Sequence, residues 1–424
     1  MQITARTRPL QGQDALMRAM FSGDDLSNTA EKMIQRASQD NLDAEALLDL
    51  SNILILRGDR EGGLGLLNEA LLLKRFFHLQ YAEEPGALRM LVLKTPGDFM
   101  ANTPIEFLTK HTGISVDVLY VAPHLPVPLA TPGHDIVFVA ISESQPNLPV
   151  LELAQRLCSR WRIPVINKPV RIPHLARDRA WELLHSIPRL DIPRTSRLTR
   201  ESLTNGNADG NLDGNTRTPA YPFIMRPLDS HAGQGLECLQ NQRDLSNYLN
   251  EHIVDEYYLS NYIDYRSTDG QFRKYRVVFV EGKAFLCHMA ISSHWMVHYL
   301  NAGMTDSSEK RNEEATMMAN FDQMFVSKHR HTFKHLVNKV DLDYFGIDCA
   351  ETPAGELLVF EVANAMVVHD MDPVDLYPYK QANMNRVFAA FQAMLHKRRL
   401  RGQNQSTVTN DQPSRRTSTS SIYA

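Results

Sequence analysis

Long hydrophobic runs are missing from this sequence of 424 residues. Its longest aliphatic stretches, such as residues 136–141, are far shorter than the roughly 20 residues that a membrane-spanning helix needs. The N-terminal segment MQITARTRPLQGQD also lacks the apolar core of a secretion signal. The sequence therefore predicts a cytoplasmic protein that neither crosses nor binds a membrane.

Cysteine is scarce as well. The four cysteines are far apart and show neither a CxxC pair nor the ligand spacing of a zinc site: Cys158, Cys238, Cys287 and Cys349. We expect buried free thiols in a reducing compartment.

A strong excess of charge of one sign is also absent. The formal net charge of −4 argues against a general nucleic-acid binder. One basic cluster ends the last predicted helix, at Lys397, Arg398, Arg399 and Arg401. It could contact nucleic acid or acidic lipid, but cations are favourable at any helix C-terminus, and we favour this plainer interpretation.

The chain is long enough for several domains. Residues 1–25 are polar and are predicted to be an irregular lead-in. Residues 26–80 contain two amphipathic helices, over 43–57 and 61–79, that resemble one tetratricopeptide-like hairpin. Because a solenoid needs about three or more such units, we expect an appended module that docks on the rest of the chain or on a protein partner.

The pattern changes after residue 88, where short aliphatic strands alternate with helical segments. This alternation predicts an α/β fold with a parallel sheet covered by helices over residues 88–190. Polar residues 204–215 are expected to be a surface insert, and residues 401–424 a disordered tail. The predicted strands cover residues 88–94, 135–141, 164–167, 221–227, 236–239, 257–265, 274–280, 284–292, 344–350 and 356–362.

A segment with little side-chain bulk joins two of these strands; we call residues 230–235 the small-residue loop. Glycine lets backbone N–H groups approach an anion closely, and successive N–H groups can form a nest for phosphate beside Arg226. An ordinary hairpin turn is the alternative. The loop consists of Ser230, His231, Ala232, Gly233, Gln234 and Gly235.

A later hairpin carries two acids, Asp348 and Glu361, which we call the acid pair. Because side chains alternate along a strand, both are predicted on one face of the hairpin, within about 4.5–8 Å of each other. Two like charges this close are destabilising unless a cation lies between them, and hard oxygen ligands suit Mg²⁺, which also binds phosphate oxygens. The alternative is two solvated carboxylates on an exposed sheet face.

The order of these features resembles the ATP-grasp superfamily, nearest to the ribosomal-protein glutamate ligases and glutathione synthetases. Residues 88–395 carry the resemblance: a Rossmann-like half, the segment IPRT at 192–195, the small-residue loop and the hairpin of the acid pair. It implies a Rossmann-like pre-ATP-grasp domain over 88–190, an ATP-grasp domain over 191–400, and ATP and Mg²⁺ as cofactors.

The resemblance also implies roles for single residues. Arg179 and Arg226 match the two lysines that hold the nucleotide phosphates, and the small-residue loop matches the flexible loop above them. Arg276 matches the arginine that steadies the acyl phosphate and the tetrahedral intermediate. The connection that binds adenine matches Tyr258, Asn261, Tyr262 and Ile263.

The acid pair matches the metal carboxylates of the family. Family members read Glu-x-Asn at this point, whereas here Glu361-Val-Ala-Asn364 moves the third ligand, Asn364, one residue further along. Strand alternation would turn Asn364 away unless the strand bulges. Both phosphate lysines are also replaced by arginine.

Histidines gather over residues 288–304, where the family binds its acceptor substrate. His288 and His294 are therefore candidate substrate contacts. His294 and His298 are four residues apart and could share a helix face as zinc ligands, but they lack the neighbouring glutamate of a metalloprotease and a third ligand.

Together these features predict an ATP-dependent carboxylate–amine ligase that works through an acyl phosphate and releases ADP. The acceptor is an amino acid, a peptide or a protein side chain. The alternative is a non-catalytic nucleotide-binding or partner-recruiting protein with a degenerate site, which the shifted Asn364 and the two arginines favour. Phosphotransfer to a hydroxyl or a small acid is a third hypothesis, and a homodimer stays open.

Overall fold

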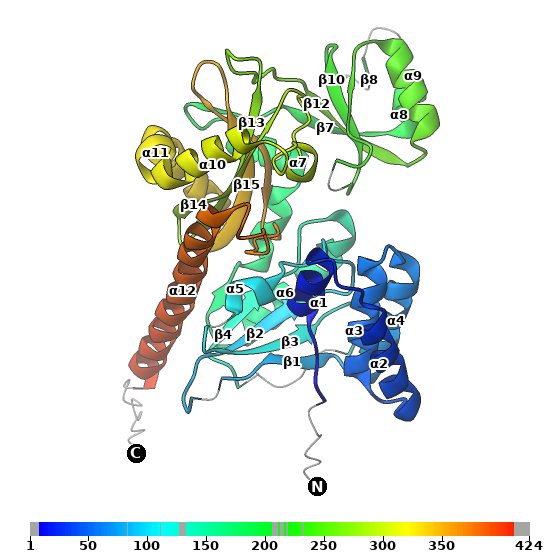
Figure 1. Ribbon diagram of the computed structural model, residues 1–424, viewed down its shortest axis with the longest axis vertical. Coiled ribbons are helices and arrows are strands. Elements are labelled where there is room, and N and C mark those ends of the chain that lie inside the picture. Colours follow the sequence, from blue (N-terminus) through cyan, green and yellow to red (C-terminus); the bar gives the residue numbers. More distant parts are fainter. Residues whose placement is uncertain are drawn as a thin grey trace, which may run out of the picture.

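The computed structural model describes residues 8–82, 84–110, 112–126, 133–205, 211–212, 216–217, 219–230 and 233–410. These residues form a mixed α/β fold, as predicted, in which the N-terminal helices lie beside one sheet and two further sheets lie beyond it (Figure 1). Within the same residues, no helix is long and apolar enough to span a membrane.

Four helices open the chain: α1 Gln13–Phe21, α2 Ser27–Gln39, α3 Ala44–Leu56 and α4 Arg60–Leu73. Aspartates cap the last two, since Asp43 accepts the Ala46 N–H at 2.9 Å and Asp59 accepts the Gly62 N–H at 2.9 Å. The prediction of an irregular lead-in over 1–25 is wrong for α1, while residues 1–7 lie outside the described part. The helix predicted over 61–79 ends early, because residues 76–80 pair as a strand.

The first sheet has the order β1-β3-β2-β4-β5, in which β1 is the antiparallel edge and the other strands are parallel. The helices α5 and α6 pack on it. The predicted strands β2, β4 and β5 are present, and β1 and β3 were not predicted. The elements are β1 Phe76–Gln80, β2 Arg89–Lys94, α5 Ile105–Thr109, β3 Ser115–Tyr120, β4 Ile136–Val139, η1 Gln145–Asn147, α6 Leu148–Arg160 and β5 Val165–Ile166.

The second sheet is antiparallel, in the order β11-β10-β12-β7, and helices α8 and α9 lie beside it (Figure 1). The small-residue loop joins β10 to β11; within it, His231 and Ala232 lie outside the described residues. Strand β8 falls in the predicted surface insert and pairs with β9, which directly follows the insert. The elements are β7 Thr195–Thr199, α8 Arg200–Asn205, β8 Asn211–Leu212, β9 Thr216–Arg217, β10 Phe223–Pro227, β11 Glu237–Leu239, α9 Gln242–Glu251 and β12 Glu256–Asn261.

The third sheet has the order β14-β13-β15-β16-β6 and is buried on both faces. On one face Phe279 and Phe345 stack at 4.8 Å and meet Phe333 of α11; on the other, Tyr344 meets Phe391 of α12 at 5.3 Å. The alternative of an exposed face for the acid pair is therefore wrong. The elements are β6 Leu190–Asp191, β13 Phe272–Val280, β14 Lys283–Ser292, α10 Ser308–Phe321, the π-turn η4 Asp322–Val326, α11 Ser327–Val340, β15 Tyr344–Glu351, β16 Leu357–Ala363 and α12 Pro378–Asn410.

Helix α12 includes the basic cluster in its body rather than at its C-terminus. Three members of the cluster pair with acids of this chain: Lys397 with Glu281 at 2.8 Å, Arg399 with Asp135 at 3.3 Å, and Arg398 with Asp343. The explanation by a helix C-terminus is therefore wrong. These cations join α12 to the first and third sheets, and residues 411–424 of the predicted tail lie outside the described part.

Phe391 provides a test of this packing. Its ring is fully buried and meets Phe138 of β4 at 5.7 Å as well as Tyr344 of β15, so it fixes the first sheet against the third. We predict that Phe391→Ala lowers the free energy of unfolding by about 3–5 kcal/mol in urea titrations, because the cavity cannot collapse between two sheets. The control Leu400→Ala, on the same helix but 60% exposed, should change it by less than about 0.5 kcal/mol.

Candidate active site

The acid pair lies on two adjacent strands of the third sheet. Asp348 of β15 is the register partner of Glu361 of β16, and a bulge follows between Asp348 and Cys349. On its other side Asp348 faces Arg276 of β13. The two acids are thus direct neighbours, as the alternation of the hairpin predicted.

Cations surround Asp348, whose side chain is only 4% exposed. Arg276 donates to both carboxylate oxygens, at 2.8 and 3.0 Å, and Lys274 approaches at 2.8 Å. Burial by itself would raise the pKa of Asp348, but the charges of Arg276 and Lys274 outweigh it and hold the pKa well below the ordinary value. The carboxylate is therefore ionised at any physiological pH.

Glu361 is the more accessible acid, with a side chain 32% exposed. Arg177 forms an ion pair with its carboxylate at 3.0 Å and donates to the carbonyl of Phe360 at 3.2 Å. Burial opposes ionisation, yet Arg177 more than compensates the repulsion from Asp348 and lowers the pKa of Glu361. Among the described residues Arg177 is its one ion-pair partner, so Glu361 can still bind a ligand from the cavity.

The small-residue loop is held at both ends. At its start, Arg226 donates to Ser230 Oγ at 2.9 Å and also to the Ser230 carbonyl. At its end, the Tyr248 hydroxyl donates to the carbonyl of Gly235 at 2.5 Å. Gly233 and Gly235 have φ of 78° and 61°, a left-handed conformation that favours glycine. Burial and the nearby Arg177 lower the pKa of Arg226 to about 9, which leaves it positive at neutral pH.

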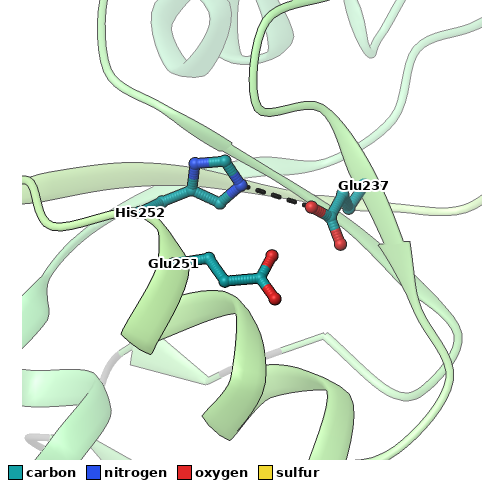
Figure 2. A group of neighbouring side chains, drawn as sticks. All are labelled: Glu237, Glu251 and His252. Atoms are coloured by element: carbon teal, nitrogen blue, oxygen red, sulfur yellow. Dashed lines mark hydrogen bonds and ion pairs between the residues drawn. The ribbon is translucent and has the colours of Figure 1, made fainter.

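A second group of acids lies beside the C-terminal end of this loop. Figure 2 shows His252 of the α9 end facing Glu237 of β11 at 3.2 Å, with Glu251 close by. Their ligand atoms lie within 4.8 Å of one another, as a metal site would require, but Glu251 is exposed and Glu237 is 46% exposed. Exposed carboxylates gather in this way without a metal, and the pair acts here as a surface ion pair.

The acid pair and the small-residue loop border one cavity of about 690 Å³ between the three sheets. Met100, after β2, and Glu143, after β4, extend its wall at the carboxyl ends of parallel strands, where open α/β sheets bind ligands. The predicted site residues that line this cavity are Arg226, Ser230, Gly233, Tyr258, Asn261, Tyr262, Ile263, Arg276, His288, Asp348, Glu361 and Asn364.

Arg179 is not brought to this cavity. It is exposed on α7, Arg177–Leu184, and Arg177 lines the cavity instead. Two residues along a helix differ by about 200° in direction, so the first residue of α7 and the third cannot face the same cavity. Gln234, Gly235 and His294 are likewise absent from the lining residues.

Asn364 lines the cavity although it follows Glu361 by three residues. Strand β16 ends at Ala363, so strand alternation no longer determines the direction of Asn364, and the bulge lies before Glu361 rather than after it. Its amide nitrogen donates to the carbonyl of Ile141 at 2.8 Å, while its amide oxygen is buried with no hydrogen-bond partner among the described residues. An acceptor oxygen in this state is available to a cation.

His288 and His294 lie in different surroundings. His288 faces Arg276 across the strand pair and stacks on Tyr299 at 4.6 Å. Burial, with the charges of Arg276 and Lys380, lowers the pKa of His288 well below its ordinary value, so its ring is neutral. His294 accepts the Met296 N–H at 3.2 Å in a segment that is not helical, so the expected shared helix face with His298 is wrong.

Sequence reasoning missed several charged residues of the cavity, among them Arg177, Lys274 and Glu143. Lys274 could have been found, because it lies two residues before Arg276 on the same face of β13. Glu143 carries no sequence signal. Burial and the nearby Asp229 raise its pKa to about 7.

No family model matches this chain, and no curated protein matches it. The tetratricopeptide-like resemblance of the N-terminal helices therefore stays a prediction. Solved structures do show similarity. A RimK domain ATP-grasp protein from Sphaerobacter thermophilus is 16% identical, with a TM-score of 0.39, over 72% of this chain and 99% of its own.

Two ligases are similar to this chain at comparably low identity. The VanG D-Ala:D-Ser ligase of Enterococcus faecalis is 12% identical, with a TM-score of 0.45, over 74% of this chain and 99% of its own. The D-alanine–D-alanine ligase of Coxiella burnetii is 13% identical, with a TM-score of 0.46, over 76% and 98%. At these values we draw nothing about the reaction from the likeness, and the function below rests on the cavity itself.

Proposed function

We propose that this protein is an ATP-dependent carboxylate–amine ligase of the ATP-grasp type. One observation carries the proposal: the acid pair, ringed by Arg177, Lys274 and Arg276, borders the same cavity as the small-residue loop. A triphosphate needs cations, a divalent metal and backbone N–H groups converging from different sides.

We further propose that the chain divides into three domains, over residues 26–80, 88–190 and 191–400.

The residues fit Mg²⁺, which prefers several oxygen ligands from carboxylates and amides. Asp348 and Glu361 are adjacent and ionised, and the buried oxygen of Asn364 lacks a hydrogen-bond partner among the described residues. Mg²⁺ bound here would neutralise the charge of phosphate oxygens. Its binding would compete with Arg177 and Lys274, which would then be free to contact phosphate.

The side chains of the cavity have distinct tasks in this reaction. Arg226, Arg177 and the small-residue loop would hold the triphosphate and balance the charge that moves with the γ-phosphoryl group to a substrate carboxylate as ADP leaves. An amine then attacks the carbonyl carbon, phosphate leaves and the amine loses a proton. Arg276, fixed by its two hydrogen bonds to Asp348, would stabilise the oxyanion.

The segment from Tyr258 to Ile263 would contact adenine. Tyr258, Asn261, Tyr262 and Ile263 all line the cavity, and β12 pairs with β10, which carries Arg226. A flat ring bound between this strand and the small-residue loop would set its phosphates toward the acid pair. The backbone N–H and C=O groups at the end of β12 could form hydrogen bonds with the edge of such a ring.

One observation favours a non-catalytic protein instead. Both oxygens of Asp348 are already bonded to cations of this chain, so the cluster is satisfied without a metal. A nucleotide could then bind without turnover, and the acid pair would be structural. ADP release dependent on an amino acid or peptide separates this alternative from the ligase.

We predict that amino acids or short peptides stimulate ADP release in the presence of Mg²⁺, and that Glu361→Gln reduces this release by at least about a hundredfold. The amide keeps the shape but cannot supply an anionic ligand. The matched control is Glu237→Gln on the surface pair of Figure 2, which should leave the rate unchanged. Full activity of Glu361→Gln would remove the metal role from the acid pair.

The two arginines of α7 give a second test. Arg177→Met should weaken ATP binding by about ten- to a hundredfold in isothermal titration, because a charge-assisted bond to phosphate is worth about 1.5–3 kcal/mol. Arg179→Met, exposed on the same helix, should change the affinity by less than about twofold. Equal effects of the two substitutions would contradict the position given to the triphosphate.

ATP affinity should also depend on pH through Glu143. Its pKa is about 7, so it is neutral below pH 7 and becomes an anion facing the cavity above it. Affinity should therefore be highest at low pH and fall about tenfold between about pH 6 and pH 8, since about 1.4 kcal/mol of repulsion corresponds to a factor of ten. Glu143→Gln should abolish most of this slope, and an unchanged slope would refute the assignment.

A further inference from the structure

The cavity continues beyond the acid pair along a chain of contacts. Arg276 is the register partner of His288, and His288 stacks on Tyr299. Tyr299 in turn contacts Lys380 of α12, whose ammonium lies 4.1 Å from the Tyr299 ring centroid and 4.4 Å from that of Tyr377. All five side chains line the same cavity. The part of the cavity that these side chains line is a second compartment beside the acid pair.

Two opposite charges border this compartment. Lys380 is only 2% exposed and pairs with Asp372 at 3.3 Å, and the side chain of Asp372 is 16% exposed. Both line the cavity. Lys380 also lies 3.7 Å from the buried Glu314 and donates to the Tyr299 hydroxyl. Asp372, the more exposed partner, is therefore an acceptor for an ammonium group, with the Lys380 cation beside it for a carboxylate, and the two charges complement the backbone end of an amino acid.

The far wall of the compartment is apolar and comes from the N-terminal helices. Met17 and Phe21 lie four residues apart on α1, hence on one face of that helix, and both line the cavity. Phe21 is 49% exposed and its ring centroid lies 6.1 Å from that of His369, in the loop that carries Asp372. Arg18 binds Asp370 of the same loop. An apolar side chain that lines a cavity and is half exposed is available to an apolar ligand.

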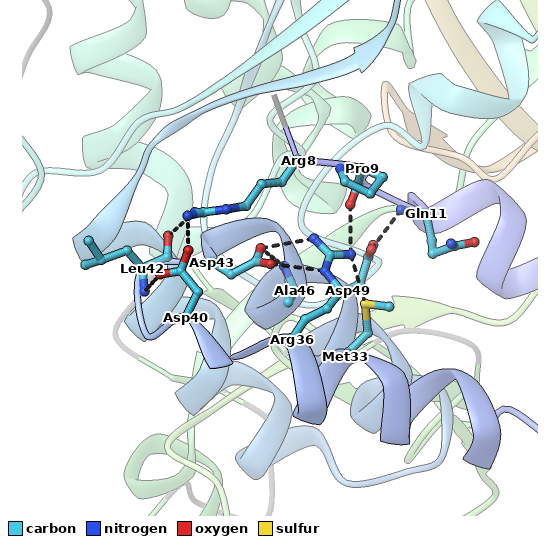
Figure 3. A network of polar contacts seen from close by, with 10 residues as sticks. All are labelled: Arg8, Pro9, Gln11, Met33, Arg36, Asp40, Leu42, Asp43, Ala46 and Asp49. Carbon is cyan, nitrogen blue, oxygen red and sulfur yellow. Dashed lines mark hydrogen bonds and ion pairs between the residues drawn. The ribbon is translucent and has the colours of Figure 1, made fainter. Parts of the chain in front are cut away.

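Polar groups that are partly or fully buried hold helix α1 in this position. Asp49 of α3 is fully buried and accepts the backbone N–H groups of Gln11 at 2.7 Å and Gly12 at 3.1 Å, just before α1 begins. Figure 3 shows the bond from Gln11 to Asp49. Beside it lies Arg36, which joins α2 to α3 through Asp43 and also donates to the Pro9 carbonyl. At the other side, Glu106 of α5 accepts the Asp14 N–H at 2.7 Å.

We propose that this compartment, which we call the acceptor compartment, binds an amino acid with an apolar side chain, and that Phe21 and Met17 of α1 determine that specificity. The proposal rests on the ligase function above. The ammonium and carboxylate of the amino acid lie against Asp372 and Lys380, and its side chain lies against α1. The N-terminal helices thus form part of the substrate site.

The test compares six amino acids, leucine, methionine, phenylalanine, glycine, glutamate and lysine, by isothermal titration and by ADP release with the full chain. The first three should bind at least about tenfold more tightly than the last three, in the range that a hydrophobic pocket gives for a few methylene groups. Phe21→Ala should raise the KM for leucine about tenfold and leave the KM for ATP unchanged. Phe21→Leu should restore most of the affinity.

The matched control is Met20→Ala. Met20 is the neighbour of Phe21, is 42% exposed and does not line the cavity, so this variant should behave as the wild type. Because Phe21 is half exposed, its truncation should not unfold the protein, and the unchanged KM for ATP verifies this. Equal behaviour of Phe21→Ala and Met20→Ala would overturn the proposal, as would a preference for glutamate or lysine.

The ligase function and the acceptor compartment can be refuted separately. If ATP binds with the expected dependence on Arg177 but none of the six amino acids binds, the acceptor compartment is refuted and the nucleotide site stands. If apolar amino acids bind in a manner that depends on Phe21 but never stimulate ADP release, the ligase function is refuted. The second result would also overturn the role of the bound amino acid as a reacting substrate.

Discussion

The structure depends on how two adjacent like charges are balanced. Asp348 and Glu361 are register partners, and Arg276, Lys274 and Arg177 surround them from β13 and α7. Leaving such charges unpaired inside a protein is costly, so the strands, α7 and the cavity must come together as one unit. The same arrangement leaves Glu361 and the oxygen of Asn364 available to the cavity. In the function that we propose, the residues of this stabilising network would also hold a metal and a triphosphate.

Segments that are far apart in the sequence meet around the cavity of the acid pair. Helix α12 contacts the first sheet through Phe138 and the third through Tyr344. The small-residue loop comes from the second sheet and is pinned by Arg226 and Tyr248. The N-terminal helices, anchored through Asp49, add an apolar wall. A cavity enclosed by separate segments can hold two substrates and exclude water, which an amide-forming reaction through an acyl phosphate requires.

Much of this could be predicted from the sequence, because aliphatic strands and amphipathic helices show their periods locally. The acid pair followed from alternation along one hairpin. Strand β3 was missed because Asp117 interrupts its apolar pattern; in the fold His78 and His134 bind that carboxylate. Arg179 was chosen in place of Arg177 from the resemblance alone, because a match in the order of segments does not determine which face of the helix meets the cavity. Glu143 and the role of α1 arise from contacts between distant segments, which no local pattern contains.

The most direct measurement is a crystal structure of the full chain with Mg²⁺ and a non-hydrolysable ATP analogue. We expect the β- and γ-phosphates between the small-residue loop and the acid pair, Mg²⁺ on Asp348 and Glu361, and Arg177 turned to phosphate. A nucleotide bound elsewhere, with Arg276, Lys274 and Arg177 still paired with the two acids, would contradict it.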